Sequence, residues 1–342
     1  MKSNILKIGP GRITEVEKTL KDCNISGKIL YVSDAYVDSL YGDRVRPQIM
    51  AIGDLQEYTV DSNTITYAMN VAEHIIASDI DCIVAMGGGR TLDVAKYAAF
   101  ISKRPFLSIP TTMSHDGIVS PIAVLKRQDD KPKSLGCAMP KMMIMDTDLL
   151  SSCPTQLIKA GIGDTISNYM ALKDWDFAVL QGKDEMNGYA YMMSRTSLDA
   201  LMKTQFDHIC PEFLEVLANS LVLSGIAMDF AGSSRPVSGS EHLFSHALDY
   251  YCDKQNLHGF NVALGTVAVL MIIDDDPTTV IKYLQRFEVD INPQSMGISE
   301  ELFIYCMQHA KEMRNNRYTY LDEADLSERK LKSIYKKIIM EF

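Results

Sequence analysis

The sequence predicts an α/β chain of two domains: a parallel sheet wrapped by helices over residues 1–152, then a nearly all-helical domain over residues 153–342. Two features predict the sheet. Short apolar runs alternate with helical patterns, and one apolar run leads directly into three glycines that open a helix. The boundary is predicted where Ser151-Ser152-Cys153-Pro154 supplies a serine cap and a first-turn proline for a long helical stretch.

The individual elements are predicted from apolar periodicity and cap residues. A helix is expected over 64–77, capped by Ser62 or Asn63. The apolar run 262–273 is well short of the roughly 20 residues of a membrane span and predicts a buried helix. The tail 326–339 is expected to be an amphipathic helix with a solvated charged face. Strands are expected at 28–34, 81–86, 105–109, 122–126 and 142–146.

Composition excludes several classes of function. A formal net charge of −10 argues against a nucleic-acid-binding surface, because phosphate backbones require a basic stripe. Seven cysteines without a CxxC pair favour a reduced chain over a disulfide framework. Residues 1–9 lack the apolar core of a signal peptide. We therefore expect a cytoplasmic protein with a small-molecule substrate and no nucleic-acid or membrane partner, and a homodimer as the default assembly.

The glycine junction is expected to hold a phosphate group. An apolar strand runs into Gly87, Gly88 and Gly89, and the helix that they open continues with Arg90 and Thr91. Only glycine lets the backbone approach a diphosphate without a Cβ in the way, and the unpaired N–H groups of the next helix attract the anion. The next strand ends at the same edge of the sheet in the hydroxyl-rich turn Pro110-Thr111-Thr112-Met113-Ser114-His115-Asp116-Gly117. Two such loops predict a nucleotide cofactor.

Asp34 ends the early strand, where nucleotide-binding folds place a carboxylate against the ribose hydroxyls and disfavour the extra phosphate of NADP. The alternative is that Asp34 caps the helix that begins near Ala35.

Asp164 and two histidines form a candidate metal site. Asp164 lies among glycines and apolar residues, and the nearest cation, Lys159, lies on another face of a regular helix. Either a salt bridge within the helical domain or a metal satisfies this carboxylate. With His242 and His258 it makes a three-ligand site that leaves one position open, as in catalytic Zn²⁺ sites. His246 shares a helix face with His242 and offers a further imidazole.

These motifs, in this order, resemble those of the sn-glycerol-1-phosphate dehydrogenase family. Its superfamily also holds glycerol dehydrogenase, the iron-dependent alcohol dehydrogenases and dehydroquinate synthase. The resemblance implies a dehydroquinate synthase-like fold and a metal-dependent hydride transfer between NAD(P)H and C2 of dihydroxyacetone phosphate or glycerol 1-phosphate. The motifs that carry it are GGGxxxDxAK at 87–96, PTTxSHDG at 110–117, the segment 235–246, and the landmarks 257–259 and 317–319.

The resemblance also implies roles for single residues. Asp164, His242 and His258 would be the metal ligands. Asp116 and His246 would be catalytic, and both would contact the substrate together with Asp164. Asp93 would support the glycine loop, whereas His115 would shape its own loop. The cofactor-binding residues would be Asp34, Gly87, Gly88, Gly89, Arg90, Thr91, Thr111, Thr112, Ser114 and Ser120.

Departures from related families narrow the expectation. Asn168 stands where iron-dependent alcohol dehydrogenases have a further histidine, so Zn²⁺ is expected, with Ni²⁺ or Fe²⁺ as alternatives. The segment 120–123 lacks the lysine of dehydroquinate synthases, and Phe260-Asn261 replaces the Glu-Gln frequent in archaeal glycerol-1-phosphate dehydrogenases.

The substrate's phosphate has a candidate ligand in Arg235, which lies in a Ser-Ser-Arg-Pro turn and either binds phosphate bidentately or braces the turn through a salt bridge. The alternative functions are a glycerol dehydrogenase for unphosphorylated glycerol or dihydroxyacetone, and a non-catalytic nucleotide-binding homologue.

Overall fold

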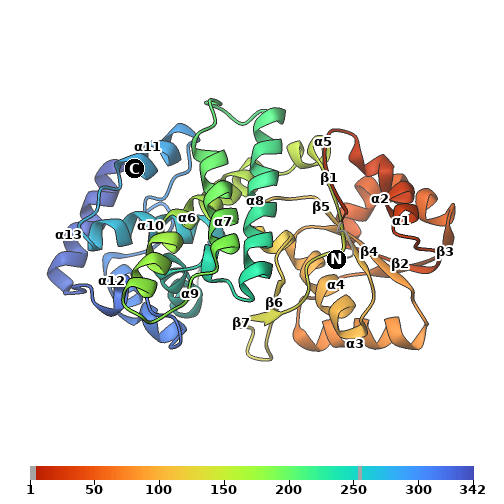
Figure 1. Ribbon diagram of the computed structural model, residues 1–342, viewed down its shortest axis with the longest axis horizontal. Helices are drawn as coiled ribbons and strands as arrows, with labels where there is room; N and C mark the ends of the chain where they lie inside the picture. Colours follow the sequence, from red (N-terminus) through yellow and green to blue (C-terminus); the bar gives the residue numbers. More distant parts are fainter. Residues whose placement is uncertain (1–4, 253–255) are drawn as a thin grey trace. The chain divides into compact units, whose positions relative to one another are not determined.

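The computed structural model describes residues 5–252 and 256–342, and the chain divides into two compact units (Figure 1). The first unit contains the residues up to Met113 together with Gly117–Pro154. The second contains Ser114–Asp116 and Thr155–Phe342. The three residues 114–116 therefore belong by their contacts to the helical unit, although the segments on both sides of them belong to the first.

A six-stranded, fully parallel sheet forms the centre of the first unit, with the strand order β1-β8-β5-β4-β2-β3. Four of its strands are buried or nearly so, as expected for a sheet covered on both faces. The edge strand β3 has an exposed, polar sequence, and the apolar pattern did not predict it. The strands are β1 Ile5–Gly9, β2 Gly27–Ser33, β3 Gly53–Thr59, β4 Cys82–Gly87, β5 Phe106–Pro110 and β8 Met142–Asp146.

The strand order reverses direction between β2 and β4. β3 continues the sheet on one side of β2, whereas β4, β5 and β8 follow on the other. In open parallel sheets, ligands bind outside the carboxyl ends of the strands at such a reversal. The register pairs Ser33, the last residue of β2, with Met86, so that Asp34 and the glycines emerge beside each other.

Helices cover both faces of this sheet. One apolar cluster joins Val16 and Leu20 of α1, and Val45 and Ile49 of α2, to alternate residues of the strands. α3 and α4 pack together, and α4 contacts β2, β4 and β5. α3 is capped by Thr64, whose hydroxyl accepts the N–H of Tyr67, and not by Ser62 or Asn63. The helices are η1 Arg12–Glu15, α1 Val16–Asp22, α2 Ala35–Met50, α3 Ile65–Ala77, α4 Gly89–Ser102, η2 Asp116–Ile118 and α5 Thr147–Ser151.

The strand at 122–126 lies outside the central sheet. β6 Ile122–Lys126 pairs antiparallel with β7 Pro132–Gly136, and the polar turn between them contains Asp130 with a φ of 59°. A hydrogen bond attaches this hairpin to α4, the helix that the glycines open: Asp93 Oδ2 accepts the N–H of Val124 at 3.1 Å.

The second unit is entirely helical in the part of the chain that the structure describes. Its longest helix, α6, crosses α10, and α10 is buried along nearly its whole length, which confirms the buried helix predicted over 262–273. The helices are α6 Thr155–Leu180, α7 Gly188–Met202, α8 Pro211–Ala231, η3 Arg235–Val237, α9 Ser240–Tyr251, α10 His258–Ile272, α11 Thr278–Arg286, α12 Glu300–His309, η4 Ala310–Met313, η5 Tyr320–Asp322 and α13 Glu328–Glu341.

One helix, α8, is long and apolar enough to cross a membrane by length and composition, with a mean hydropathy of 1.5. Buried core helices of soluble proteins meet the same criterion, and 61% of its apolar window is buried within the protein. The helix also bonds to its neighbours: the carbonyl of Ser220 accepts the hydroxyl of Ser197, and the hydroxyl of Ser224 accepts the amide of Asn168. These contacts are those of a core helix.

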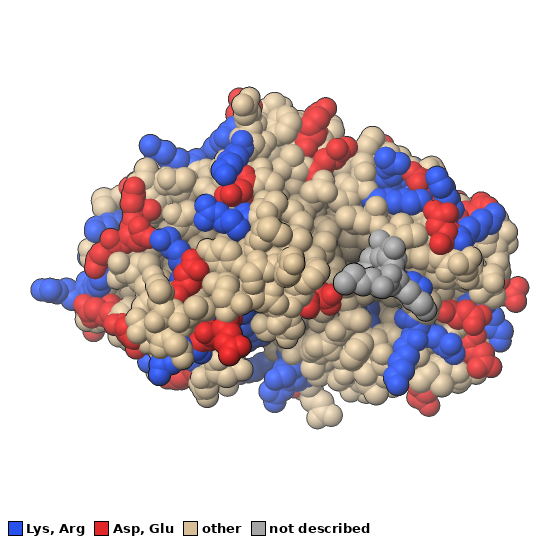
Figure 2. All heavy atoms as spheres, viewed as in Figure 1, with Lys and Arg blue, Asp and Glu red and all other residues tan. Residues whose placement is uncertain are grey.

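Acidic and basic side chains are interspersed on the face drawn in Figure 2, and among the described residues no continuous basic stripe crosses that face. The lack of a basic stripe on this face is consistent with the net charge of −10.

Candidate metal and cofactor sites

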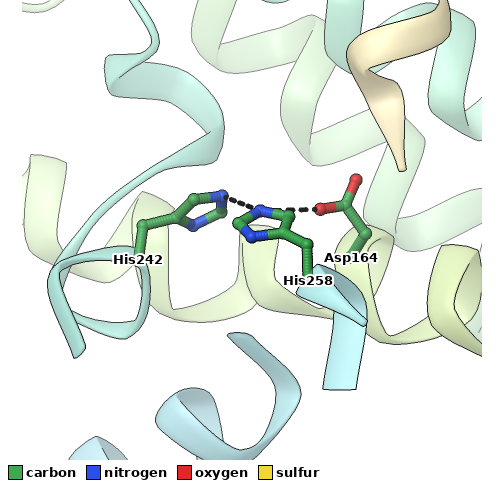
Figure 3. Close-up of side chains that lie close together, drawn as sticks. All are labelled: Asp164, His242 and His258. Carbon is green, nitrogen blue, oxygen red and sulfur yellow. Dashed lines mark hydrogen bonds and ion pairs between the residues drawn. The ribbon is translucent and has the colours of Figure 1, made fainter. Parts of the chain in front are cut away.

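Three helices of the second unit bring Asp164, His242 and His258 together (Figure 3). Asp164 lies in α6, His242 in the first turn of α9, and His258 is the first residue of α10. The Nε2 atoms of the two histidines are 3.2 Å apart, and Nε2 of His258 is 3.6 Å from Oδ1 of Asp164. Candidate ligand atoms of all three residues lie within 4.8 Å of one another.

The Nδ1 atom of each imidazole has a hydrogen-bond partner on the side away from the cluster. Nδ1 of His242 is 2.8 Å from Oε1 of Glu241, a fully buried carboxylate, and Nδ1 of His258 is 3.3 Å from the hydroxyl of Ser245. A hydrogen on Nδ1 leaves the lone pair of Nε2 directed toward the cluster. Such a partner behind a ligand histidine is the usual way in which proteins fix the tautomer and orientation of the ring.

Electrostatics keep these imidazoles neutral. Burial, and then the positive charges of Arg317 and Arg314, lower the pKa of His242 to about 3. Burial also lowers the pKa of His258 well below its usual range. Neutral imidazole is the form that binds a metal.

Asp164 has no lysine or arginine partner within the described residues. Burial, and then the Asp116 carboxylate, raise the pKa of Asp164 well above its usual range. No lysine or arginine nitrogen described lies within 4.0 Å of it, and Lys159 pairs with Glu288 instead. The ion-pair partner of Asp164 is thus the imidazole of His258, which its lowered pKa keeps neutral, and a buried carboxylate beside two imidazoles is suited to a cation.

The spacing of these atoms fits a small tetrahedral cation. Ligand bonds of about 2.0–2.1 Å give a tetrahedron with edges of about 3.3 Å. The two closest approaches in the cluster, 3.2 Å and 3.6 Å, are close to this value. Two imidazoles and one carboxylate are also the donor set of many catalytic zinc sites, in which the fourth position stays open.

Two glycines allow helices α6 and α10 to pack closely where they cross. A Cβ at Gly163 would lie 2.3 Å from the carbonyl oxygen of Gly259, and a Cβ at Gly259 would lie 1.8 Å from that of Ala160. No side chain fits at either position without moving a backbone. Since Gly163 precedes Asp164 and Gly259 follows His258, the close crossing sets the distance between the carboxylate and the imidazole.

Asp116 and His246 lie beside the cluster. The backbone N–H of Asp116 donates to Oδ2 of Asp164 at 2.8 Å, which leaves Oδ1 facing His258. The ring of His246 is 6.2 Å from that of His242, and burial followed by repulsion from His242 lowers its pKa to about 3. His246 does not join the group of mutually close ligand atoms. The ring of His115 packs edge-on against that of His258 at 6.2 Å.

In the first unit, the glycine junction forms an open helix N-terminus. Gly88 is the N-cap of α4 and provides no side-chain hydrogen bond to it. A Cβ at Gly87 would lie 2.7 Å from the Cβ of Thr91, so this glycine is required by packing. A Cβ at Gly88 would meet Thr112 no closer than 3.6 Å, so the fold itself does not require glycine there. The bare backbone at Gly88 leaves room for the phosphate group that the sequence predicts at this helix N-terminus.

Asp34 lies beside this terminus and caps α2. Its Oδ1 accepts the N–H of Val37 at 3.0 Å, and its Oδ2 accepts the hydroxyl of Thr91 at 3.1 Å. The cap considered from the sequence is therefore present, and it leaves the ribose contact as a prediction. Thr111 is anchored by its N–H to the carbonyl of Gly87 at 2.9 Å.

Asp93 and Lys96 are a buried brace and not a surface pair. Lys96 is 2% exposed, lies 3.3 Å from Asp93, and donates to the carbonyls of Gly117 and Ser120. The pair thus ties α4 to the loop that carries Ser120, and the support of the glycine loop by Asp93 stays a prediction. Arg90 is exposed in the first turn of α4. Thr112 and Ser114 are half-buried in the loop that follows β5.

Arg235 braces its turn. Its side chain is 4% exposed, its Nε lies 2.9 Å from Oδ2 of Asp184, and its Nη2 donates to the carbonyls of Asp174 and Tyr318. The salt-bridge brace considered from the sequence is therefore present, whereas Nη1 of Arg235 is buried without a hydrogen-bond partner and the phosphate contact stays a prediction. Arg314 and Arg317 lie nearby; the sequence analysis noted Arg317, within the landmark 317–319, and did not note Arg314.

Comparison with known proteins supports one family. Residues 7–154 match the family described as iron-containing alcohol dehydrogenase. The glycerol-1-phosphate dehydrogenase (NAD(P)+) of Hyperthermus butylicus is 34% identical over 323 residues, which cover 94% of this chain and 92% of that protein.

Two solved structures share the fold. Glycerol dehydrogenase of Schizosaccharomyces pombe has a TM-score of 0.81 at 16% identity, over 99% of this chain and 89% of that one. Sulfoacetaldehyde reductase of Bifidobacterium kashiwanohense, in complex with NAD+, has a TM-score of 0.72 at 16% identity, over 99% of this chain and 98% of that one. The predicted α/β fold with a helical second domain is confirmed.

Proposed function

Because the chain belongs to the glycerol-1-phosphate dehydrogenase family, we propose that it reduces C2 of dihydroxyacetone phosphate with NAD(P)H to give glycerol 1-phosphate, and catalyses the reverse oxidation. The observation that carries this proposal is the convergence of ligand atoms of Asp164, His242 and His258 within 4.8 Å, with the Nε2 atoms of the two imidazoles facing each other. We further propose a cytoplasmic homo-oligomer as the working form.

The three residues would hold a divalent cation, with Zn²⁺ the expected ion and Ni²⁺ or Fe²⁺ the alternatives. When bound, such a cation supplies Lewis-acid polarisation of the carbonyl and stabilises the charge that develops on its oxygen. Glu241 and Ser245 fix the tautomers of His242 and His258, and the N–H of Asp116 restrains Asp164.

Asp116 and His246 would orient the substrate hydroxyls and relay the proton. The imidazole of His246 is neutral at physiological pH because its pKa is lowered to about 3, so it both donates and accepts a hydrogen bond. This suits a residue that passes a proton between a hydroxyl and solvent.

The cofactor would lie along the carboxyl edge of the sheet. The backbone N–H groups from Gly88 to Thr91 at the start of α4 would bind the diphosphate, and Asp34 would accept the ribose hydroxyls. The nicotinamide side would be lined by Thr111, Thr112, Ser114 and Ser120.

Substitution of Gly88→Ala tests the diphosphate site. The fold has room for this Cβ, so we expect the midpoint of thermal unfolding to stay within about 2 °C of wild type. The methyl group would block the diphosphate, and the Kd for NADH, measured by fluorescence, should rise about 10-fold or more. Gly136→Ala, in open space on the β6–β7 hairpin, is the matched control with unchanged affinity. Equal NADH affinity in both variants would contradict the site.

The function itself is tested by steady-state kinetics. Metal-loaded protein is assayed with dihydroxyacetone phosphate and with dihydroxyacetone, each with NADH and with NADPH. We expect dihydroxyacetone phosphate to have the higher kcat/KM. A preference for dihydroxyacetone would indicate a glycerol dehydrogenase, and no turnover of either substrate would indicate a non-catalytic homologue.

A further inference from the structure

Two arginines close to the metal-binding helix α9 have no acidic partner. Arg314 follows η4, and Arg317 closes the turn that begins there, because its N–H donates to the carbonyl of Arg314 at 3.1 Å. Among the residues that the structure describes, no carboxylate oxygen lies within 4.0 Å of either guanidinium. The neighbouring Arg235, in contrast, pairs with Asp184. A half-buried positive charge without a counter-charge is costly, and two of them side by side are more so.

Both guanidinium groups converge on one hydroxyl. Nη1 of Arg314 and Nη2 of Arg317 donate to Oγ of Ser234 at 2.8 and 3.2 Å, and Nη1 of Arg317 donates to the carbonyl of Ser238. These described bonds use one N–H of Arg314 and two of Arg317. Each guanidinium has five N–H groups, so most donors of the pair are left for solvent or a ligand.

Arg314 and Arg317 lie close to α9, the helix that carries His242 and His246. η4, which Arg314 follows, packs against α9, and the carbonyl of Ser238 that accepts from Arg317 lies two residues before the start of α9. Burial and repulsion from Arg314 and Arg235 lower the pKa of Arg317 to about 9, although Glu241 attracts its charge. The carboxylates of Glu241 and Asp184 compensate the charge of Arg317 only in part, and an anion beside the pair would relieve its internal repulsion.

We propose that the guanidinium groups of Arg314 and Arg317 bind the phosphate group of the substrate. The shared bonds to Ser234 hold the two guanidinium groups side by side, and their remaining N–H groups can donate to the oxygens of a tetrahedral dianion, which accepts such charge-assisted bonds well. A phosphate held by this pair lies next to α9, which carries His242 and His246. This inference rests on the proposed function and names the residues that select the phosphorylated substrate.

Substitution of Arg314 separates phosphate binding from bracing. We expect Arg314→Ala to raise the KM for dihydroxyacetone phosphate about 10- to 100-fold, the cost of a lost charge-assisted contact, and to affect dihydroxyacetone far less. Arg314→Lys keeps the charge without the fork and should give an intermediate KM. Arg195→Ala, which removes an exposed arginine from α7, should leave both substrates unchanged. An equal loss with both substrates in Arg314→Ala and Arg314→Lys would assign the pair to bracing and overturn the proposal.

Binding of inorganic phosphate gives a readout that does not depend on turnover. At constant ionic strength, phosphate should raise the thermal unfolding midpoint of wild type, and this shift should shrink in Arg314→Ala and Arg314→Lys. No shift in wild type, or an equal shift in all three proteins, would overturn the phosphate site. A wild-type protein that binds phosphate through the pair but does not reduce dihydroxyacetone phosphate would sustain the site and refute the proposed function.

Discussion

His258→Ala is expected to lower kcat/KM for dihydroxyacetone phosphate about 1,000-fold or more and to release most of the bound metal. The substitution removes the imidazole that lies between the other two members of the cluster, 3.2 Å from His242 and 3.6 Å from Asp164. A loss of about 4 kcal/mol of transition-state stabilisation, typical of an electrophilic group, corresponds to this factor. Metal content is measured by elemental analysis of the purified protein, alongside steady-state kinetics.

Two controls separate loss of the site from loss of the fold. His208→Ala removes an exposed histidine that contacts only Asp207 among its described polar partners, and should keep wild-type metal content and rate. NADH binding by His258→Ala should be retained, because the glycine loop belongs to the other unit. A His258→Ala protein with a full equivalent of metal and wild-type kcat/KM would refute the ligand assignment.

The sequence predicts best where one physical signal dominates. Continuous apolar runs place β4, β5 and α10, because a parallel sheet and a core helix leave few polar positions. The glycine junction is predictable because the apolar strand β4 leads directly into it. Packing against Thr91 also requires glycine at Gly87. Asp164 is identifiable as a carboxylate in need of a partner because its neighbours are small and apolar.

Other features depend on contacts between distant segments. The i, i+3 spacing of Asp93 and Lys96 looks like that of a surface pair, yet the loop at 117–124 closes over both side chains and buries them. β3 is missed because an edge strand needs little apolar sequence. Arg235 and Arg314 carry the same charge on neighbouring turns, and only the position of Asp184 gives the first a carboxylate partner.

The close crossing of α6 and α10 at Gly163 and Gly259 is the part of the candidate metal site that should tolerate substitution least. Gly259→Ala is expected to push α10 away from α6, because the new Cβ would lie 1.8 Å from the carbonyl oxygen of Ala160, a backbone atom that cannot rotate aside. Overpacking of this kind costs about 1–3 kcal/mol. The same displacement moves His258 relative to Asp164, so affinity for the cation should fall about 10-fold or more.

Stability is measured by urea unfolding of the metal-free protein and affinity by competition with a chelator, which separates the two effects. Gly188→Ala is the matched control, since it adds the same methyl group to the first residue of α7, where no atom lies within 4 Å. It should leave metal affinity unchanged and leave stability equal or raise it by about 0.4–1 kcal/mol, through the reduced freedom of the unfolded chain. If Gly259→Ala matched Gly188→Ala in both measurements, the close crossing would not be what sets the distance between Asp164 and His258.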